Sequence, residues 1–182
     1  MIEFKGFQER LVGQEVNFNP FERCLDIVIN QAGYYGIPRK TSIPRAKKLL
    51  ADLGLGEKEN ATALSLSGGM KRRLMIARAL VIEPRFLILD EPTAGVDVEL
   101  RRSMWEYLEG LTKKGVTILL TTHYLEEAER LAKHVAINKG EVVAHGTMQE
   151  ILALHNADTA DKYSTSKLEQ IFITLTSEKE KS

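Results

Sequence analysis

The spacing of hydrophobic residues changes several times along the chain, and it predicts helices that alternate with short strands. Between residues 22 and 35, apolar side chains recur three and four positions apart, as on the buried face of a helix. Apolar runs at Phe86–Leu89 and Val116–Leu120 predict strands that are buried on both faces. Further helices are predicted at residues 42–53, 68–81, 98–114, 124–133, 147–154 and 167–175.

Shorter apolar segments complete the expected strands. Leu11–Glu15 has the pattern of a short strand that runs into a loop. Residues 135–137 and 141–144 flank Asn138-Lys139-Gly140, which predicts a hairpin turn. Strands that alternate with helices predict an α/β layer architecture with a mainly parallel sheet.

Length and composition fit one domain with at most a small appendage. The chain has 182 residues, of which 43% are hydrophobic and 27% charged, as in ordinary globular proteins. With 25 basic and 25 acidic residues it lacks the basic excess that broad nucleic-acid binding needs. Cys24 is the only cysteine, which excludes an internal disulfide. The apolar runs are far shorter than the ~20 residues that span a bilayer.

Two adjacent carboxylates, Asp90 and Glu91, follow the first apolar run. Open α/β sheets bind ligands at the carboxyl ends of their strands. Because side chains alternate along a strand, one carboxylate can hold Mg²⁺ while the other activates a water for in-line attack on phosphorus. The simpler alternative is a strand that ends in two solvated acids.

His123 follows the second apolar run. If neighbouring parallel strands end together, His123 lies at the same edge as Asp90 and Glu91, where an imidazole can hydrogen-bond a terminal phosphate and the attacking water. An ordinary surface histidine is the alternative. The other histidines stand about ten residues apart and form no short ligand pair, so a zinc site is not predicted.

Ser67, Gly68 and Gly69 open a predicted helix. Two glycines let backbone N–H groups approach an anion, and the start of a helix carries partial positive charge. The basic run Lys71–Arg73 raises the local potential. The alternative is a plain helix cap with a glycine-rich turn.

Gln14 and Asp97 are further candidates. Gln14 stands at a strand-to-loop junction, from which its amide can reach a metal or a water. Asp97 precedes a predicted helix, so a capping role is its simplest interpretation.

In their order along the chain, these motifs resemble the ATP-binding subunit of ABC transporters. The order is Gln14, Leu66–Met70 (LSGGM), Phe86–Pro92 (FLILDEP), Ala94–Asp97 (AGVD) and His123. Two segments, Lys71–Leu74 and Glu91–Asp97, are most similar in sequence to bacterial subunits of the exporter class. The resemblance extends from Gln8 to Met148.

The resemblance implies catalytic roles for four of these residues, with ATP and Mg²⁺ as cofactors. Asp90 would be the Walker B aspartate that coordinates Mg²⁺, and Glu91 would be the general base. Gln14 would sense Mg²⁺ and the transmembrane partner. His123 would be the switch histidine.

The resemblance places the other motif residues at a dimer interface. Ser67, Gly68 and Gly69 would be the signature that closes on the γ-phosphate of ATP held by a second subunit. Asp97 would belong to the loop that contacts this second subunit. A homodimer of ATP-binding subunits is therefore expected.

The implied fold is an incomplete three-layer core of the P-loop NTPase type with a helical subdomain. Residues 1–154 would form a partial ATP-binding domain, with a helical subdomain at 18–64 and half of the catalytic core at 65–148. Residues 155–182 would form a short tail. The helical subdomain would dock on a transmembrane permease, which implies a cytoplasmic protein held peripherally at the inner face of the membrane, without nucleic acid.

The sequence contains no phosphate loop: none of its 13 glycines is followed by lysine. We therefore expect an N-terminally truncated subunit that lacks the Walker A loop, with an exposed sheet edge and negligible ATP binding and turnover alone. Its signature can still complete the site of an intact partner. The alternative function is a non-enzymatic interaction fragment that pairs with an intact subunit or a membrane partner. A DNA-repair or chromosome-structure ATPase is disfavoured, because no long coiled coil precedes the signature.

Overall fold

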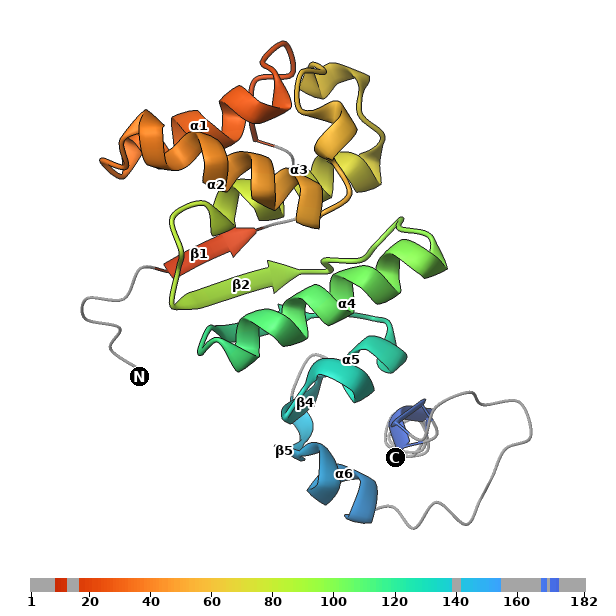
Figure 1. The fold of residues 1–182 in the computed structure, drawn as a ribbon. Helices are drawn as coiled ribbons and strands as arrows, with labels where there is room; N and C mark the ends of the chain where they lie inside the picture. The colour runs from red at the N-terminus through yellow and green to blue at the C-terminus, as the bar shows by residue number, and fades with distance from the viewer. Residues whose placement is uncertain (1–8, 13–16, 139–141, 155–167, 170, 174–182) are drawn as a thin grey trace. The chain divides into compact units, whose positions relative to one another are not determined.

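The computed structural model describes residues 9–12, 17–138, 142–154, 168–169 and 171–173 (Figure 1). The chain divides into two compact units, residues 1–121 and residues 122–182. Each unit is described by itself below. The domain boundaries expected from the sequence stay a prediction.

Three strands form a parallel sheet in the first unit. They are β1 (Glu9–Val12), β2 (Phe86–Asp90) and β3 (Thr117–Thr121), in the order β1-β2-β3. Val12 pairs with Leu89, and Leu89 with Leu120, so the carboxyl ends of the strands meet at one edge. The mainly parallel sheet expected from the sequence is confirmed.

Helices flank this sheet, and Figure 1 shows α1, α2 and α3 grouped next to one another. Arg45 of α2 donates to Val81 O at the end of α3 (2.8 Å), and Arg73 of α3 donates to Leu53 O at the end of α2 (2.8 Å). Each of these helices thus caps the C-terminus of the other. The helices of the first unit are α1 (Cys24–Tyr34), α2 (Arg39–Asp52), α3 (Gly68–Leu80) and α4 (Val98–Lys113), with short 3₁₀ turns at Gly56–Lys58 and Ala63–Ser65.

Helix α2 begins earlier than its sequence suggests. A start at Ser42 is wrong, because Pro38 has extended backbone angles and its carbonyl accepts the N–H groups of both Thr41 and Ser42 (2.9 Å each). Pro44, expected to mark the helix start, lies inside α2 instead.

Burial differs between the two apolar runs. Leu87 and Leu89, on one face of β2, are fully buried as predicted, while Phe86 and Ile88 on the other face are half-buried and Leu119 of β3 is 53% exposed. The prediction that both faces of β3 are buried is therefore wrong. In the described part of the chain β3 pairs only with β2, which leaves it at a sheet edge with less cover than the central strand.

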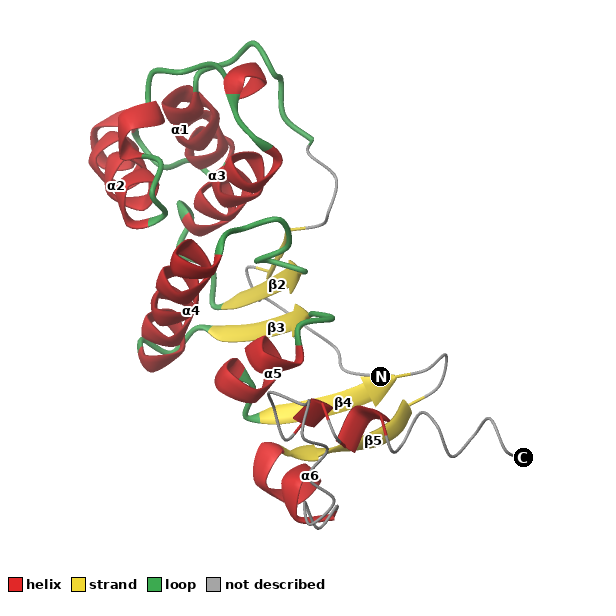
Figure 2. Cartoon of the chain, turned by 90° about the vertical axis from the view of Figure 1, so that its right-hand side faces the viewer, coloured by secondary structure: helices red, strands yellow, loops and turns green. Residues whose placement is uncertain are grey.

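The second unit contains an antiparallel hairpin and helices, seen in Figure 2. The hairpin prediction is confirmed, although Lys139 and Gly140 of the expected turn lie outside the described residues. The core of this unit consists of Ile137, Ile151, Leu168 and Ile171. Residues 168–169 and 171–173 are helical, within the last predicted helix. The named elements are α5 (Leu125–Leu131), β4 (His134–Asn138), β5 (Val142–Thr147) and α6 (Met148–Leu154).

Thr147 and Glu150 form a reciprocal cap at the start of α6. Thr147 Oγ1 accepts the Glu150 N–H (3.1 Å), while Glu150 Oε2 accepts both the N–H and the hydroxyl of Thr147 (2.8 Å each). These two bonds favour the ionised carboxylate and hold the pKa of Glu150 below its ordinary value.

We expect this cap to lose stability in acid. The pKa of Glu150 is depressed in the folded state, so its contribution is present above the ordinary glutamate pKa and is lost as the pH falls through the folded pKa. An NMR titration of the Glu150 carboxyl should give a midpoint below that of an ordinary glutamate, and Thr147→Ala should raise it. Thr112→Ala, on the exposed face of α4, is the control and should leave the midpoint in place. Equal midpoints in wild type and Thr147→Ala would contradict the assignment.

Candidate functional site

The carboxyl end of β2 carries Asp90, which is tied to the neighbouring strand. Asp90 is level with Thr121 of β3, and the Thr121 hydroxyl donates a hydrogen bond to Asp90 Oδ1. The Glu91 N–H then donates to Thr121 O at 2.9 Å. Both carboxylate residues are half-buried. The edge where the strands end therefore presents two adjacent acids, as the sequence predicts.

Glu91 has a backbone conformation that the sequence does not predict. Its φ is +47°, in the left-handed region that non-glycine residues seldom adopt. Its carbonyl accepts the Ala94 N–H (3.2 Å), which closes a turn over the fully buried Thr93. The chain therefore turns sharply at Glu91, and this residue leaves the regular course of the strand directly after Asp90.

Ser67 caps α3. Its extended backbone precedes the helix, and its Oγ accepts the Met70 N–H (3.3 Å). The simple capping interpretation of this serine is thus confirmed. Ser67 and Gly68 are exposed, and a Cβ on Gly68 would meet nothing within 4 Å. The start of α3 is consequently open to a ligand or a partner.

Gly69 packs against a loop that is distant in sequence. A Cβ at this position would lie 3.1 Å from Gly95 O and 3.6 Å from a methyl group of Val96. Gly95 has a φ of +71°, which glycine adopts without strain. The Ser-Gly-Gly turn and the loop before α4 are therefore direct neighbours.

We expect Gly69→Ala to be less stable than Gly68→Ala by about 1 kcal/mol. Only the methyl group added at position 69 would press on a backbone carbonyl, that of Gly95. Both variants remove the same glycine freedom from the unfolded chain. Urea unfolding followed by the fluorescence of Trp105, which is buried in α4, gives the comparison. The same midpoint for both variants would show that the contact with Gly95 is unimportant.

Arg72 and Arg73, which belong to the basic run, both donate to backbone carbonyls of other segments. Arg72 Nη1 donates to Asp90 O (2.6 Å) and Glu91 O (2.5 Å). Arg73 is 5% exposed and donates to Leu53 O (2.8 Å), to Gly54 O (3.2 Å) and, through Nε, to Gly69 O (3.4 Å). Burial lowers the pKa of Arg73, and the charge of Asp97 opposes that shift. Arg72, two residues after the LSGGM motif on α3, therefore joins this helix to the FLILDEP motif.

Asp97 is the N-cap of α4, since its Oδ1 accepts the Leu100 N–H (2.9 Å). Its side chain is exposed. The capping role predicted from the sequence is confirmed, and the exposure leaves the loop before α4 open to a second chain.

Two predicted site residues are not placed beside the carboxylates by the structure. Gln14 lies outside the described residues, two positions after the end of β1. His123 is an exposed residue of the second unit, where its ring contacts the Tyr124 ring in a tilted arrangement, with 4.2 Å between centroids and 36° between the planes. It follows Thr121, the residue paired with Asp90, by two positions.

The donor set fits Mg²⁺ held together with a phosphate ligand. Among the described residues, no three His, Cys, Asp or Glu side chains gather into a metal cage. Mg²⁺ commonly uses one or two carboxylates, with waters and substrate phosphates as its other ligands. Asp90 accepts a hydroxyl through Oδ1 and can offer its second oxygen to such an ion.

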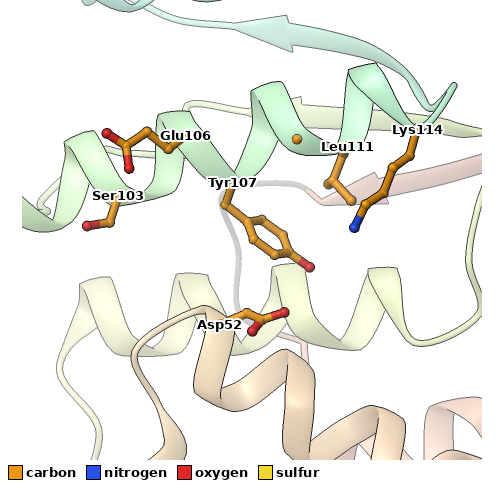
Figure 3. A pocket seen from close by; sticks show the side chains of 7 residues that line it. Asp52, Ser103, Glu106, Tyr107, Leu111 and Lys114 are labelled. Carbon is orange, nitrogen blue, oxygen red and sulfur yellow. The ribbon is translucent and has the colours of Figure 1, made fainter.

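A separate groove of about 380 Å³ lies along α4, lined by Asp52, Tyr107, Leu111 and Lys114 among others (Figure 3). The Tyr107 hydroxyl points toward Asp52 in this view. Burial and then the Asp52 charge raise the pKa of Tyr107 to about 12. The groove contains none of the predicted site residues.

No helix in the described ranges has the length and apolar content needed to cross a membrane.

Comparison with known proteins places the motifs in a family. The family model described as ABC transporter matches residues 5–94. The chain is 42% identical to the Nod factor export ATP-binding protein I of Cupriavidus metallidurans over 145 residues, which cover 79% of this chain and 48% of that protein. The homologous protein of Burkholderia lata is 45% identical over 143 residues, with 78% and 47% covered. The chain thus spans about half the length of these relatives.

Solved structures agree on the fold. One described as the ATP-binding subunit of an ABC transporter has a TM-score of 0.77 at 26% identity and covers 93% of this chain and 68% of its own. A dimeric ATP-binding cassette bound to ADP and phosphate has a TM-score of 0.68 at 24% identity, with 78% and 63% covered. The chain therefore belongs to the ABC transporter family, and it corresponds to part of an ATP-binding subunit.

Proposed function

We propose that the chain acts within an ATP-hydrolysing subunit of a bacterial exporter, which powers transport through a separate membrane subunit. The observation that carries this proposal is the open start of α3, with Ser67 and Gly68 exposed and Gly69 packed against the loop before Asp97. The export function of the named relatives supports the exporter class.

Asp90 and Glu91 would divide the chemistry of ATP hydrolysis to ADP and phosphate. Asp90 would hold Mg²⁺, which neutralises charge on the phosphate oxygens when it is bound. Glu91 would accept a proton from the water that attacks the γ-phosphorus. Gln14 would respond to the metal and to the membrane subunit, and His123 would hydrogen-bond the γ-phosphate.

Ser67, Gly68 and Gly69 would serve a nucleotide held by a second subunit. The first N–H groups of a helix have no partner inside it, and they carry the positive end of its dipole. Together with the Ser67 hydroxyl they suit a γ-phosphate presented from outside. Asp97, exposed in the neighbouring loop, would contact the same partner. A dimer of ATP-binding subunits is the assembly in which these groups act.

The domain organisation follows the same proposal. Residues 18–64 would form the helical subdomain that docks on the permease, and residues 65–148 would form half of the catalytic core. This docking would place the protein at the inner face of the cell membrane. Within residues 1–182 no Gly-Lys pair exists, so a polypeptide of these residues alone should show negligible ATP binding and turnover. Micromolar affinity in a nucleotide titration would contradict that expectation.

The test is to mix residues 1–182 with the intact Cupriavidus metallidurans relative, at a dilution where that relative is monomeric. Its ATPase rate should rise and then saturate as the chain is added, because the signature completes the partner's site. An unchanged rate at all ratios would refute the proposed trans role.

A non-enzymatic interaction fragment is the second candidate. Phe21 and Leu64 are 74% and 57% exposed, and their segments are joined by the bond from Leu64 N–H to Pro20 O (2.7 Å). Two exposed apolar side chains on adjoining segments suit a protein partner. Binding to the intact subunit without any change in its ATPase rate would favour this candidate.

A further inference from the structure

One guanidinium nitrogen of Arg72 reaches two consecutive carbonyl groups of the FLILDEP motif. Nη1 lies 2.6 Å from Asp90 O and 2.5 Å from Glu91 O. This nitrogen carries two hydrogens, one for each carbonyl. Charge-assisted hydrogen bonds are about twice as strong as neutral ones. Arg72 therefore binds the peptide carbonyls on both sides of the Glu91 Cα.

One of the two carbonyls that Arg72 contacts belongs to Glu91, whose backbone is strained. Glu91 has a φ of +47°, a left-handed backbone conformation that is strained for a non-glycine residue. Two neutral backbone bonds also hold this turn, from the Glu91 N–H to Thr121 O (2.9 Å) and from the Ala94 N–H to Glu91 O (3.2 Å). Arg72 adds the charged donor to this set.

Arg72 and Arg73 are adjacent in sequence but donate hydrogen bonds to different segments of the chain. Arg73 caps the end of α2 through Leu53 O and Gly54 O, away from the carboxylates. Arg72 is half-buried and directs its charge at the carbonyls of Asp90 and Glu91. The basic run thus contains one residue that stabilises helix packing and one that contacts the carboxylate motif.

We propose that Arg72 is a positioning residue: it holds Glu91 in the left-handed conformation and fixes the carboxylate motif to α3, the helix that begins with the signature. This inference rests on the proposed function in giving Glu91 the role of general base and in placing the signature on a partner's nucleotide. The signature and the Glu91 turn then move as one body, so that closure of the signature on a partner's nucleotide is coupled to the geometry of Glu91.

The test compares Arg72→Met with Arg72→Lys and with Lys71→Met in residues 1–182. Met keeps apolar volume without donors, Lys keeps charged donors on a thinner side chain, and Lys71 is the half-buried neighbour on α3. In Arg72→Met the Glu91 Cα and carbonyl resonances should move, and exchange of the Ala94 amide should accelerate about tenfold. Arg72→Lys should recover part of both effects, and Lys71→Met should show neither.

A folded Arg72→Met chain with wild-type Glu91 resonances and Ala94 exchange would overturn the proposal. So would failure of Arg72→Lys to recover anything, because loss of packing alone would then explain the effect. If Arg72→Met does not fold, Arg72→Gln replaces it, since the shorter amide cannot span both carbonyls; wild-type exchange at Ala94 would again overturn the proposal. If wild type leaves the intact subunit's ATPase rate unchanged, the proposed trans role fails, while the NMR result still decides the role of Arg72.

Discussion

Replacing Arg73 with methionine should lower the free energy of unfolding of the first unit by about 3 kcal/mol, because the change leaves the buried Leu53 carbonyl without its charged donor. Arg73 donates to Leu53 O at 2.8 Å and to Gly54 O at 3.2 Å, the carbonyls at the end of α2. A helix end offers carbonyls that lack intrahelical partners, and a cation there also interacts favourably with the helix dipole. Methionine fills part of the space but supplies neither charge nor donor.

The fluorescence of Trp105, the only tryptophan, reports on the first unit during urea unfolding. Arg102→Met is the matched control, since Arg102 is exposed on α4 and surface changes usually stay within about 0.5 kcal/mol. Gly54→Ala should also destabilise this unit, because its Cβ would lie 2.8 Å from Arg73 Nη1 at a φ of +66°. Equal stability of Arg73→Met and Arg102→Met would show that the cap on α2 is dispensable.

Replacing Gly68 with aspartate should abolish the effect of the chain on an intact subunit while leaving its fold in place. A side chain at this position meets no atom within 4 Å, and an acidic residue in the first turn of a helix is favourable. The same carboxylate would stand where the γ-phosphate of the partner's ATP is expected. Repulsion there should reduce the stimulated ATPase rate by about 100-fold, the scale on which such anion sites contribute to catalysis.

Gly33→Asp provides the control for charge and for loss of glycine. Gly33 lies in α1, and a Cβ there also meets nothing within 4 Å. The Gly33→Asp chain should stimulate the intact subunit as wild type does, and both variants should unfold near the wild-type temperature. Full stimulation by a folded Gly68→Asp chain would remove the start of α3 from the proposed site.

The elements that carry the motifs were predictable because their local signals agree. Gly68–Leu80 combines a serine cap, helical spacing and a following Pro84, and Phe86–Asp90 is a continuous apolar run. The parallel pairing of β2 with β3 follows from strands that alternate with helices. Asp97 was likewise predictable as a cap from its place before α4.

Other features depend on contacts between distant segments, which no local pattern encodes. The approach of Gly69 to Gly95 joins two loops, and the burial of Arg73 depends on carbonyls at the end of α2. The left-handed Glu91 lies in a turn that is held by Thr121 and Arg72 from other elements. The exposure of β3 depends on how much of the chain packs over this edge strand. An apolar run alone does not predict that packing.

The most direct test of the trans role is sedimentation velocity of the fluorescently labelled chain with the intact Cupriavidus metallidurans subunit, in EDTA so that ATP is not hydrolysed. We predict a complex of one chain with one intact subunit when ATP is present, and separate species when it is absent. The same result with and without ATP, whether association or none, would contradict a signature that closes on the partner's nucleotide.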